Sequence, residues 1–251
     1  MLYKMKMKIK HPQLNPKKTF KNFIESDCNR MVRTVGLSIA EQISESTYNP
    51  FFIYGSTGGG KTHLINAIGM RCMELYPKKR VLYVSARQFQ MEFTDSVRKN
   101  TTKKFISFYQ SLDLLIVDDI QEWMNSPKTL DSFFHIFNYL IRNERQIILA
   151  SDRPPVDLQG IKKRLITHFA SGLIAKLEKP NEKLCIDILN AKFQRGGLQI
   201  PADVAEFIAK NANGNVCILE SVINSLIAYY SINKTNIDMN LVEHVIKLFT
   251  K

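Results

Sequence analysis

Apolar residues in this chain fall into two patterns that alternate along its first 178 positions. One is a short continuous run, which is typical of a strand buried on both faces of a sheet. Phe51–Tyr54 is such a run, and four more apolar-rich segments predict further strands: Val81–Ser85, Leu114–Asp118, Ile147–Ser151 and Leu173–Leu177. The other is a stripe at three- and four-residue spacing, which predicts the helices between them: Asn29–Ser44, a helix from Lys61 that stops before Pro77, Phe89–Arg98, Thr101–Ser111 and a helix carrying Leu130–Ile141. Strands that alternate with helices predict an α/β domain with a mostly parallel sheet and helices on both faces.

Beyond Lys179-Pro180 only the helical pattern continues. Four segments have it: Leu184–Phe193, Pro201–Lys210, Asn215–Tyr230 and Asp238–Phe249. Asp238 is a favourable N-cap and Pro201 suits a first helical turn. We therefore expect a basic N-terminal arm over residues 1–13, an α/β domain over 14–178 and a small α-helical subdomain over 179–251.

The chain has 251 residues and a formal charge of +12, with a pI near 9.5. This excess of positive charge favours polyanionic partners such as nucleic acid or anionic lipid, although a lysine-rich solvated surface explains the charge equally well.

The four cysteines, at positions 28, 72, 185 and 217, form no C-x-x-C pair, which disfavours a zinc site and indicates reduced thiols in a cytosolic setting. No apolar run approaches the length of a membrane span, and the N-terminus has no apolar segment of the kind a secretory signal needs.

The segment Gly55–Thr62 reads Gly-Ser-Thr-Gly-Gly-Gly-Lys-Thr and fits G-x-x-x-x-G-K-[ST] between a predicted strand and a predicted helix. In such a loop the backbone N–H groups of Gly55, Ser56, Thr57, Gly58, Gly59 and Gly60 approach phosphate oxygens, because glycines present no Cβ. Lys61 would reach the β- and γ-phosphates, and the Thr62 hydroxyl would bind Mg²⁺. A chance glycine-rich turn is the alternative, and the fixed spacings in a strand–loop–helix context disfavour it.

Two carboxylates end the strand Leu114–Asp118, and a third follows the next strand. Asp118 is placed to hold Mg²⁺ through water, and Asp119 to orient an attacking water. Asp152 lies where a polar sensor of the γ-phosphate is expected, although an Asp before Arg-Pro-Pro also suits a turn.

Longer stretches of the chain resemble one family. They include Asn15-Pro-Lys-Lys-Thr-Phe20, Tyr48–His63, Leu114-Leu-Ile-Val-Asp-Asp-Ile-Gln121, Phe133-Phe-His135 and Gln146-Ile-Ile-Leu-Ala-Ser-Asp-Arg-Pro-Pro155. They are similar to the AAA+ domain of the bacterial replication initiator DnaA family, and the resemblance extends from about residue 14 to the C-terminus. It implies a P-loop AAA+ three-layer domain with a five-stranded parallel sheet, followed by a helical lid subdomain.

The resemblance also implies residue roles. Asn29 and Arg30 lie in a segment that resembles the family's N-terminal box, which packs on the adenine of ATP or ADP. Asp118 and Asp119 match the metal and catalytic carboxylates, and Asp152 matches the first sensor. Arg164 matches a basic position of the inter-subunit box.

Several positions depart from the family pattern. The arginine finger is replaced by His168, and the second-sensor arginine by Cys217. An arginine finger contributes roughly 10³–10⁵ in rate, so these replacements predict slow or absent hydrolysis. A glycine of the adenine box is missing near Ser26. Of two basic residues that the family uses for single-stranded DNA, Lys128 is present and Ser126 replaces the other.

Three functions stay open at this stage. The first is a regulator of replication initiation, similar to the short initiator-related regulator Hda, that binds ATP or ADP with Mg²⁺ and associates with a DnaA-type initiator or with itself. The second is an active ATPase initiator core that binds single-stranded DNA, and the third is a helicase loader. A small-metabolite kinase is disfavoured because no arginine-bearing lid accompanies the carboxylates. A protein without a duplex-reading helix-turn-helix domain is expected, whether it is naturally short or an excised domain, and so is a cytoplasmic, nucleoid-associated bacterial location.

Overall fold

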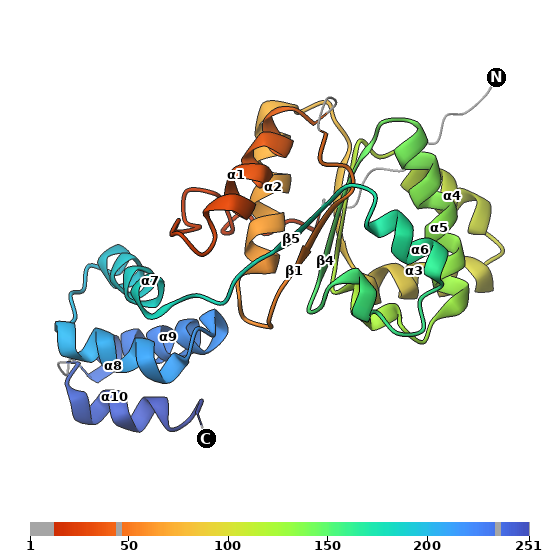
Figure 1. The fold of residues 1–251 in the computed structure, drawn as a ribbon. Coiled ribbons are helices and arrows are strands. Elements are labelled where there is room, and N and C mark those ends of the chain that lie inside the picture. The colour runs from red at the N-terminus through yellow and green to blue at the C-terminus, as the bar shows by residue number, and fades with distance from the viewer. Residues whose placement is uncertain (1–12, 44–46, 234–236, 251) are drawn as a thin grey trace. The chain divides into compact units, whose positions relative to one another are not determined.

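A computed structural model of the protein describes residues 13–43, 47–233 and 237–250 (Figure 1). The basic arm expected over residues 1–13 lies, apart from Gln13, outside these described ranges. The chain forms two compact units. Among the described residues, the first contains 13–23, 34–43, 47–54 and 62–175, and the second contains 24–33, 55–61, 176–233 and 237–250. The division into residues 14–178 and 179–251 stays a prediction about folding units.

A five-stranded sheet forms the centre of the first unit, in the order β2-β3-β4-β1-β5. Its strands are β1 (Phe51–Tyr54), β2 (Val81–Ser85), β3 (Leu114–Asp118), β4 (Gln146–Ser151) and β5 (Leu173–Lys176). The ladders that join β2 to β3, β3 to β4 and β4 to β1 are parallel. Because the strands are parallel, their carboxyl ends meet at one edge, where Ser85 pairs with Asp118 and Tyr54 with Ser151.

Helices cover both faces of this sheet and make it the middle of three layers (Figure 1). On one face, Leu115 and Val117 pack in an aromatic-rich core with residues of α3 (Ala86–Arg98), α4 (Thr102–Gln110), α5 (Pro127–Arg142) and α6 (Lys163–Phe169). On the other, Gly69 of α2 (Lys61–Leu75) lies against the Ile116 side chain, and α2 in turn packs on α1 (Arg30–Glu41) through Gly36 and Ile68. Successive strand residues point to opposite faces, so both faces of β3 are apolar. The predicted α/β class and five-stranded parallel sheet are confirmed.

The structure differs from the sequence-based prediction in its short helices and in the start of one longer helix. The sequence pattern did not predict α6 or the 3₁₀ turns η1 (Ile120–Trp123) and η2 (Pro155–Asp157). Each is at most seven residues long, so each is too short to show a helical period. Helix α3 begins at Ala86, ahead of the predicted Phe89, because the Ser85 hydroxyl accepts a hydrogen bond from the Gln88 N–H at 3.2 Å and caps it.

Four helices make up most of the second unit: α7 (Glu182–Arg195), α8 (Ala202–Ala212), α9 (Val216–Asn233) and α10 (Met239–Ile246). They enclose an apolar core of their own, which includes Leu189, Ile208 and Leu226. Asp238 is the N-cap of α10, as its residue type predicts, and accepts a hydrogen bond from the Leu241 N–H at 2.9 Å. Pro201 lies one residue before α8 rather than in its first turn. The all-helical character of the segment is confirmed.

Candidate functional site

The glycine-rich loop joins β1 to α2, as its spacing predicts. Gly58 and Gly60 have φ angles of +79° and +100°, which are strained for any residue with a side chain. A Cβ at Gly55 would lie 2.3 Å from the Leu177 carbonyl oxygen. Glycine is therefore required at these positions by backbone conformation or by close approach.

Lys61 folds back over this loop. Its Nζ donates hydrogen bonds to the carbonyl oxygens of Gly55 at 2.7 Å and Ser56 at 3.1 Å, and the residue is only 7% exposed. Helix α2 begins at Lys61, so the unpaired N–H groups of its first turn and the ammonium group lie at the same end of the loop. This is a concentration of donors and positive charge suited to phosphate oxygens.

The Asp118 carboxylate lies at the end of β3 and is held by three hydrogen bonds. Its Oδ2 accepts from the Thr62 hydroxyl at 2.7 Å and from the Tyr83 hydroxyl at 2.9 Å. Its Oδ1 accepts from the Asp119 backbone N–H at 3.0 Å. Burial and, second, repulsion from the Asp119 carboxylate raise the pKa of Asp118, while the three hydrogen bonds act in the opposite direction. Burial and the same Asp118 carboxylate raise the pKa of Tyr83 well above its usual range, so the Tyr83 hydroxyl stays a donor.

Thr62 and Asp118 are suitable ligands for Mg²⁺. Both offer oxygen atoms, which hard divalent cations prefer, and they are already within hydrogen-bond distance of each other. Within the described residues, no group of three or more His, Cys, Asp and Glu side chains could hold a metal ion by itself. A magnesium ion here would need phosphate oxygens and water to complete its coordination, as is usual for Mg²⁺ bound with a nucleotide.

Gln121 links two of the predicted site residues, and no sequence motif gives it a role of its own. Its Nε2 donates to Asp119 Oδ1 at 3.0 Å. Its Oε1 accepts from the Ser151 hydroxyl at 3.1 Å and from the Asp152 backbone N–H at 3.2 Å. One amide therefore connects the loop after β3 to the end of β4. In the sequence, the one feature that points to Gln121 is its place at the end of the stretch Leu114–Gln121 that resembles the family.

Asp119 and Asp152 each have a conformation that bears on their predicted roles. Asp119 adopts the left-handed region with φ +57°, which aspartate tolerates better than most residues. Asp152 accepts two hydrogen bonds from the Arg153 guanidinium, at 2.8 and 2.9 Å. Its carboxylate therefore has a cationic partner in the next residue.

Asn29 and Arg30 both serve the local structure of their segment. Asn29 is 5% exposed; its side chain accepts from the Ser26 N–H and donates to the Ile24 carbonyl. Arg30 pairs with Glu25 and with Asp27 in contacts that are largely exposed. The adenine contact that the resemblance implies for this segment stays a prediction.

The start of α9 lies against the phosphate loop, within the second unit. The Val216 N–H donates to the Gly58 carbonyl at 2.9 Å, and Asn215 Oδ1 caps the helix by accepting from the Cys217 N–H at 3.0 Å. A Cβ at Gly58 would lie 2.1 Å from that same Oδ1. Cys217 itself is exposed and free. Cys217, where the resemblance implies a second-sensor arginine, thus directly follows the residue that bonds to the loop.

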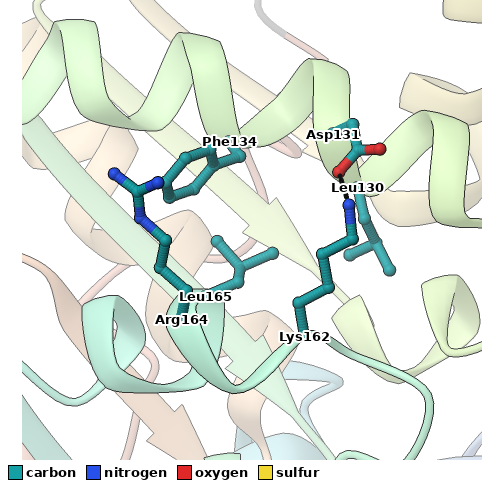
Figure 2. Close-up of a pocket in the computed structure, with 6 residues that line it drawn as sticks. All are labelled: Leu130, Asp131, Phe134, Lys162, Arg164 and Leu165. Carbon is teal, nitrogen blue, oxygen red and sulfur yellow. Dashed lines mark hydrogen bonds and ion pairs between the residues drawn. The ribbon is translucent and has the colours of Figure 1, made fainter.

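Arg164 and His168 lie one helical turn apart on α6 and face α5. The Arg164 guanidinium lies 4.7 Å from the centroid of the Phe134 ring, and the His168 ring packs edge-on against Phe134 at 5.4 Å. Arg164 also lines a cavity of about 140 Å³ whose apolar side is formed by Leu130, Phe134 and Leu165 and whose rim carries a Lys162–Asp131 ion pair (Figure 2). Both predicted inter-subunit residues therefore pack against the Phe134 ring.

Lys128 is exposed on the first turn of α5. The neighbouring Ser126, which replaces a basic residue of the family, accepts a hydrogen bond from Gln90 Nε2 at 3.0 Å. Lys128 is thus available for an anionic partner, whereas Ser126 forms a hydrogen bond between the start of α5 and α3.

The family model described as the bacterial DnaA ATPase domain matches residues 14–176. The chain belongs to this family. The chromosomal replication initiator protein DnaA of Bacteroides fragilis is 50% identical over 236 residues, which are 94% of this chain and 50% of that protein. The corresponding protein of Flavobacterium psychrophilum is 44% identical over 239 residues, or 95% of this chain and 50% of that protein. The chain spans about half the length of these curated relatives.

Solved structures of DnaA agree with the fold. Domain III of the Thermotoga maritima DnaA superposes with a TM-score of 0.90 at 32% identity, covering 95% of this chain and 99% of that one. A DnaA bound to AMPPCP and single-stranded DNA gives 0.80 at 35% identity, covering 89% of this chain and 67% of that one. The Thermotoga maritima RuvB branch migration motor, at 18% identity and a TM-score of 0.67, covers 92% of this chain and 72% of its own and shares the AAA+ fold. The predicted DnaA-family AAA+ fold is confirmed. Among the described residues, no helix is both long and apolar enough to cross a membrane.

Proposed function

We propose that the protein binds ATP or ADP with Mg²⁺ and acts in the initiation of chromosomal DNA replication, or in its regulation, with weak or absent ATP hydrolysis. The observation that carries this proposal is the phosphate loop, with Lys61 folded over it and Thr62 bonded to Asp118. Lys61 and the loop N–H groups from Gly55 to Gly60 would hold the phosphates. Thr62 and Asp118 would hold Mg²⁺, which when bound would neutralise phosphate charge.

Relatives support the nucleotide part of the proposal. A structure of DnaA from Aquifex aeolicus, 37% identical with a TM-score of 0.80, is bound to AMPPCP. We assign the base-side contact to the segment with Asn29 and Arg30, and the orientation of water and the sensing of the γ-phosphate to Asp119 and Asp152. The Gln121 bridge supports the grouping of these two residues, because its amide bonds to the Asp119 carboxylate and to the Asp152 backbone N–H.

The weak-hydrolysis part rests on His168 and Cys217. Neither side chain offers the permanently charged, forked guanidinium that an arginine presents to a transferring phosphoryl group. His168 is also half-buried against Phe134 and Phe137, which restrains its reach.

Nucleotide binding and turnover measured on the same purified protein test this function. We expect saturable binding of fluorescent ATP and ADP analogues, with phosphate release near the background given by Lys61→Ala. The matched control is Lys79→Ala, a lysine that pairs with Asp113 away from the loop and should leave binding unchanged. Absence of binding in the unaltered protein would overturn the proposal, and turnover well above the Lys61→Ala background would overturn its hydrolysis part.

Single-stranded DNA is a second proposed ligand, and one solved relative supports it because that DnaA carries both AMPPCP and single-stranded DNA. The exposed Lys128 and the charge of +12 suit a phosphate backbone. Affinity for an oligonucleotide should fall with salt, and Lys128→Ala should weaken it and reduce the salt slope by about one unit. Lys210→Ala, which removes an exposed lysine of α8, serves as control. Equal losses of affinity in both variants would show that only the net charge of the protein matters.

Association with a DnaA-type initiator or with a second copy is the proposed role of the α6 surface. Arg164 is exposed there and donates no hydrogen bond within the described part of the chain, so its guanidinium edge is available to a partner. Sedimentation with nucleotide, alone and with a cognate initiator, tests this role. Loss of a complex in Arg164→Ala but not in Arg195→Ala is the expected result, and absence of any complex would contradict it.

A further inference from the structure

Tyr83 contacts Asp118 but belongs to none of the motifs in the sequence. It lies in β2, whose register places Tyr83 opposite Ile116 and Ser85 opposite Asp118. Residues two apart share one face of a sheet, so Tyr83, Ser85 and Asp118 are on the same face. Two residues correspond to about 6–7 Å along a strand, and the phenol is long enough to bring its hydroxyl to Asp118 across that diagonal.

The hydroxyl of Tyr83 bonds to Asp118 Oδ2 at 2.9 Å. The other donor to that oxygen is Thr62, which is itself proposed to bind the metal ion. The donor to Oδ1 is the Asp119 N–H, which belongs to the same loop as the carboxylate. Tyr83 is therefore the side chain that restrains Asp118 from a separate strand and has no metal-binding task of its own.

We propose that Tyr83 is a positioning residue of this site: its hydroxyl holds the Asp118 carboxylate at the edge of the sheet in the orientation in which it would bind Mg²⁺. The inference rests on the proposed function, because the metal ion is expected to arrive with nucleotide phosphates. Hydrogen-bonding partners of this kind orient a ligating side chain, and their removal typically lowers metal affinity 10- to 100-fold. Nothing in the phosphate-loop pattern requires a tyrosine at this place.

The chain offers a matched control in Tyr109. Its hydroxyl also donates to a carboxylate, Glu92 Oε2, at 2.7 Å, and its ring is fully buried in the same aromatic core that lies under β3. Tyr109→Phe therefore removes a similar tyrosine–carboxylate hydrogen bond without touching Asp118.

Binding of a fluorescent ATP analogue is measured at increasing Mg²⁺ and again in EDTA. For Tyr83→Phe we expect the Mg²⁺ midpoint to rise about tenfold, with unchanged affinity in EDTA, and for Tyr109→Phe no change in either. An unchanged midpoint in Tyr83→Phe, or equal losses with and without Mg²⁺, would overturn the inference.

A second measurement needs no nucleotide. Urea unfolding of Tyr83→Phe, Asp118→Asn and the double variant forms a cycle that isolates the contact between the two side chains. The shift in midpoint caused by Tyr83→Phe should shrink by at least half when Asp118 is already replaced. Equal shifts in both backgrounds would overturn the inference. If the unaltered protein binds no nucleotide, the proposed function fails, and the inference is then decided by this cycle.

Discussion

The Thr62 hydroxyl donates to Asp118 Oδ2 at 2.7 Å, which joins two residues that lie 56 positions apart in the chain. One is in the first turn of α2 and the other is the last residue of β3. This contact turns two separate sequence motifs into one oxygen-lined site.

Thr62→Val keeps the shape of the side chain and removes the hydroxyl, whereas Thr62→Ser keeps the hydroxyl. A hydrogen bond to a charged group contributes about 1.5–3 kcal/mol, so we expect Mg²⁺-dependent nucleotide affinity to fall roughly 10- to 100-fold in Thr62→Val. Thr62→Ser should remain within a few-fold of the unaltered protein. Equilibrium titration with a fluorescent nucleotide at fixed Mg²⁺ measures both, and similar losses in the two variants would show that packing, not the hydroxyl, matters.

Gln121→Ala should destabilise the protein. The substitution leaves the Ser151 hydroxyl and the Asp152 N–H without their acceptor, which costs about 1–3 kcal/mol. Urea unfolding measures this loss. Gln88→Ala is the control, because Gln88 Nε2 bonds to Glu92 one turn away on the same helix and should cost less. Turnover measured on Gln121→Ala then tests whether the bridge also serves Asp119 and Asp152; no change in stability would mean that the bridge is not formed in solution.

Gly58→Ala and Gly197→Ala separate backbone strain from steric conflict. Both glycines have positive φ, +79° and +72°, so both substitutions cost about 1–2 kcal/mol from the left-handed conformation. A Cβ at Gly58 would also meet Asn215 Oδ1 at 2.1 Å, whereas nothing lies within 4 Å of a Cβ at Gly197. We expect Gly58→Ala to lower stability more and to impair nucleotide binding, with Gly197→Ala leaving binding intact. Equal unfolding midpoints in the two variants would contradict the close approach of α9 to the loop.

His168→Arg should raise ATP turnover if the missing cation limits hydrolysis. An arginine finger contributes roughly 10³–10⁵ in rate, and the gain should depend on protein concentration because, in the association proposed above, residue 168 would act on a neighbouring copy. Phosphate release measured over a range of concentrations checks this, with Lys61→Ala added to the same variant as control. Cys217→Arg, beside the phosphate loop, should act independently of concentration. If ATP turnover stays at background in both variants, the absence of these two arginines does not explain the weak hydrolysis.

The buried thiol of Cys72 predicts a loss of stability at alkaline pH. Burial and, second, the Asp113 carboxylate raise the pKa of Cys72 from 9.0 to about 12, while Lys79 lowers it. Above pH 9 the unfolded chain therefore releases this proton before the folded protein does, so the free energy of unfolding falls between about pH 9 and 12, by up to about 1.4 kcal/mol per pH unit from this group. Urea unfolding across this range should show a shallower decline in Cys72→Ala. The exposed Cys217→Ala is the control and should keep the original slope; a Cys72→Ala slope equal to it would refute the assignment.

Strands were the elements that the sequence predicted best. The predicted ranges Phe51–Tyr54, Val81–Ser85 and Leu114–Asp118 match the structure residue for residue, and the other two differ by one residue at one end. Strands β1, β3 and β4 are buried along nearly their whole length, so the requirement for apolar residues can be seen locally in their sequences. Helix α6 was missed because seven residues after a turn provide too little periodicity.

The candidate site was predicted in part. Spacing alone identified the loop from Gly55 to Thr62, because the backbone conformation it needs restricts which residues can occupy it. The contacts of Tyr83 and Gln121 could not be predicted in the same way. Neither residue type is unusual in its local context, and the contacts of Tyr83 with Asp118 and of Gln121 with Ser151 and Asp152 depend on the way the strands are arranged.

The sequence by itself determined the strand–loop–helix that carries the phosphate loop, the family to which the chain belongs, and the substitutions at His168 and Cys217. The phosphate loop could be recognised because it depends on residue types at short, fixed spacing, whereas the family and the two substitutions follow from a resemblance along most of the chain. Only the tertiary structure decided which side chains hold Asp118 and how Asp119 is linked to Asp152. The order β2-β3-β4 places Tyr83 on one side of β3 and the end of β4 on the other, and this lateral order is set by long-range packing of strands that are distant in the chain.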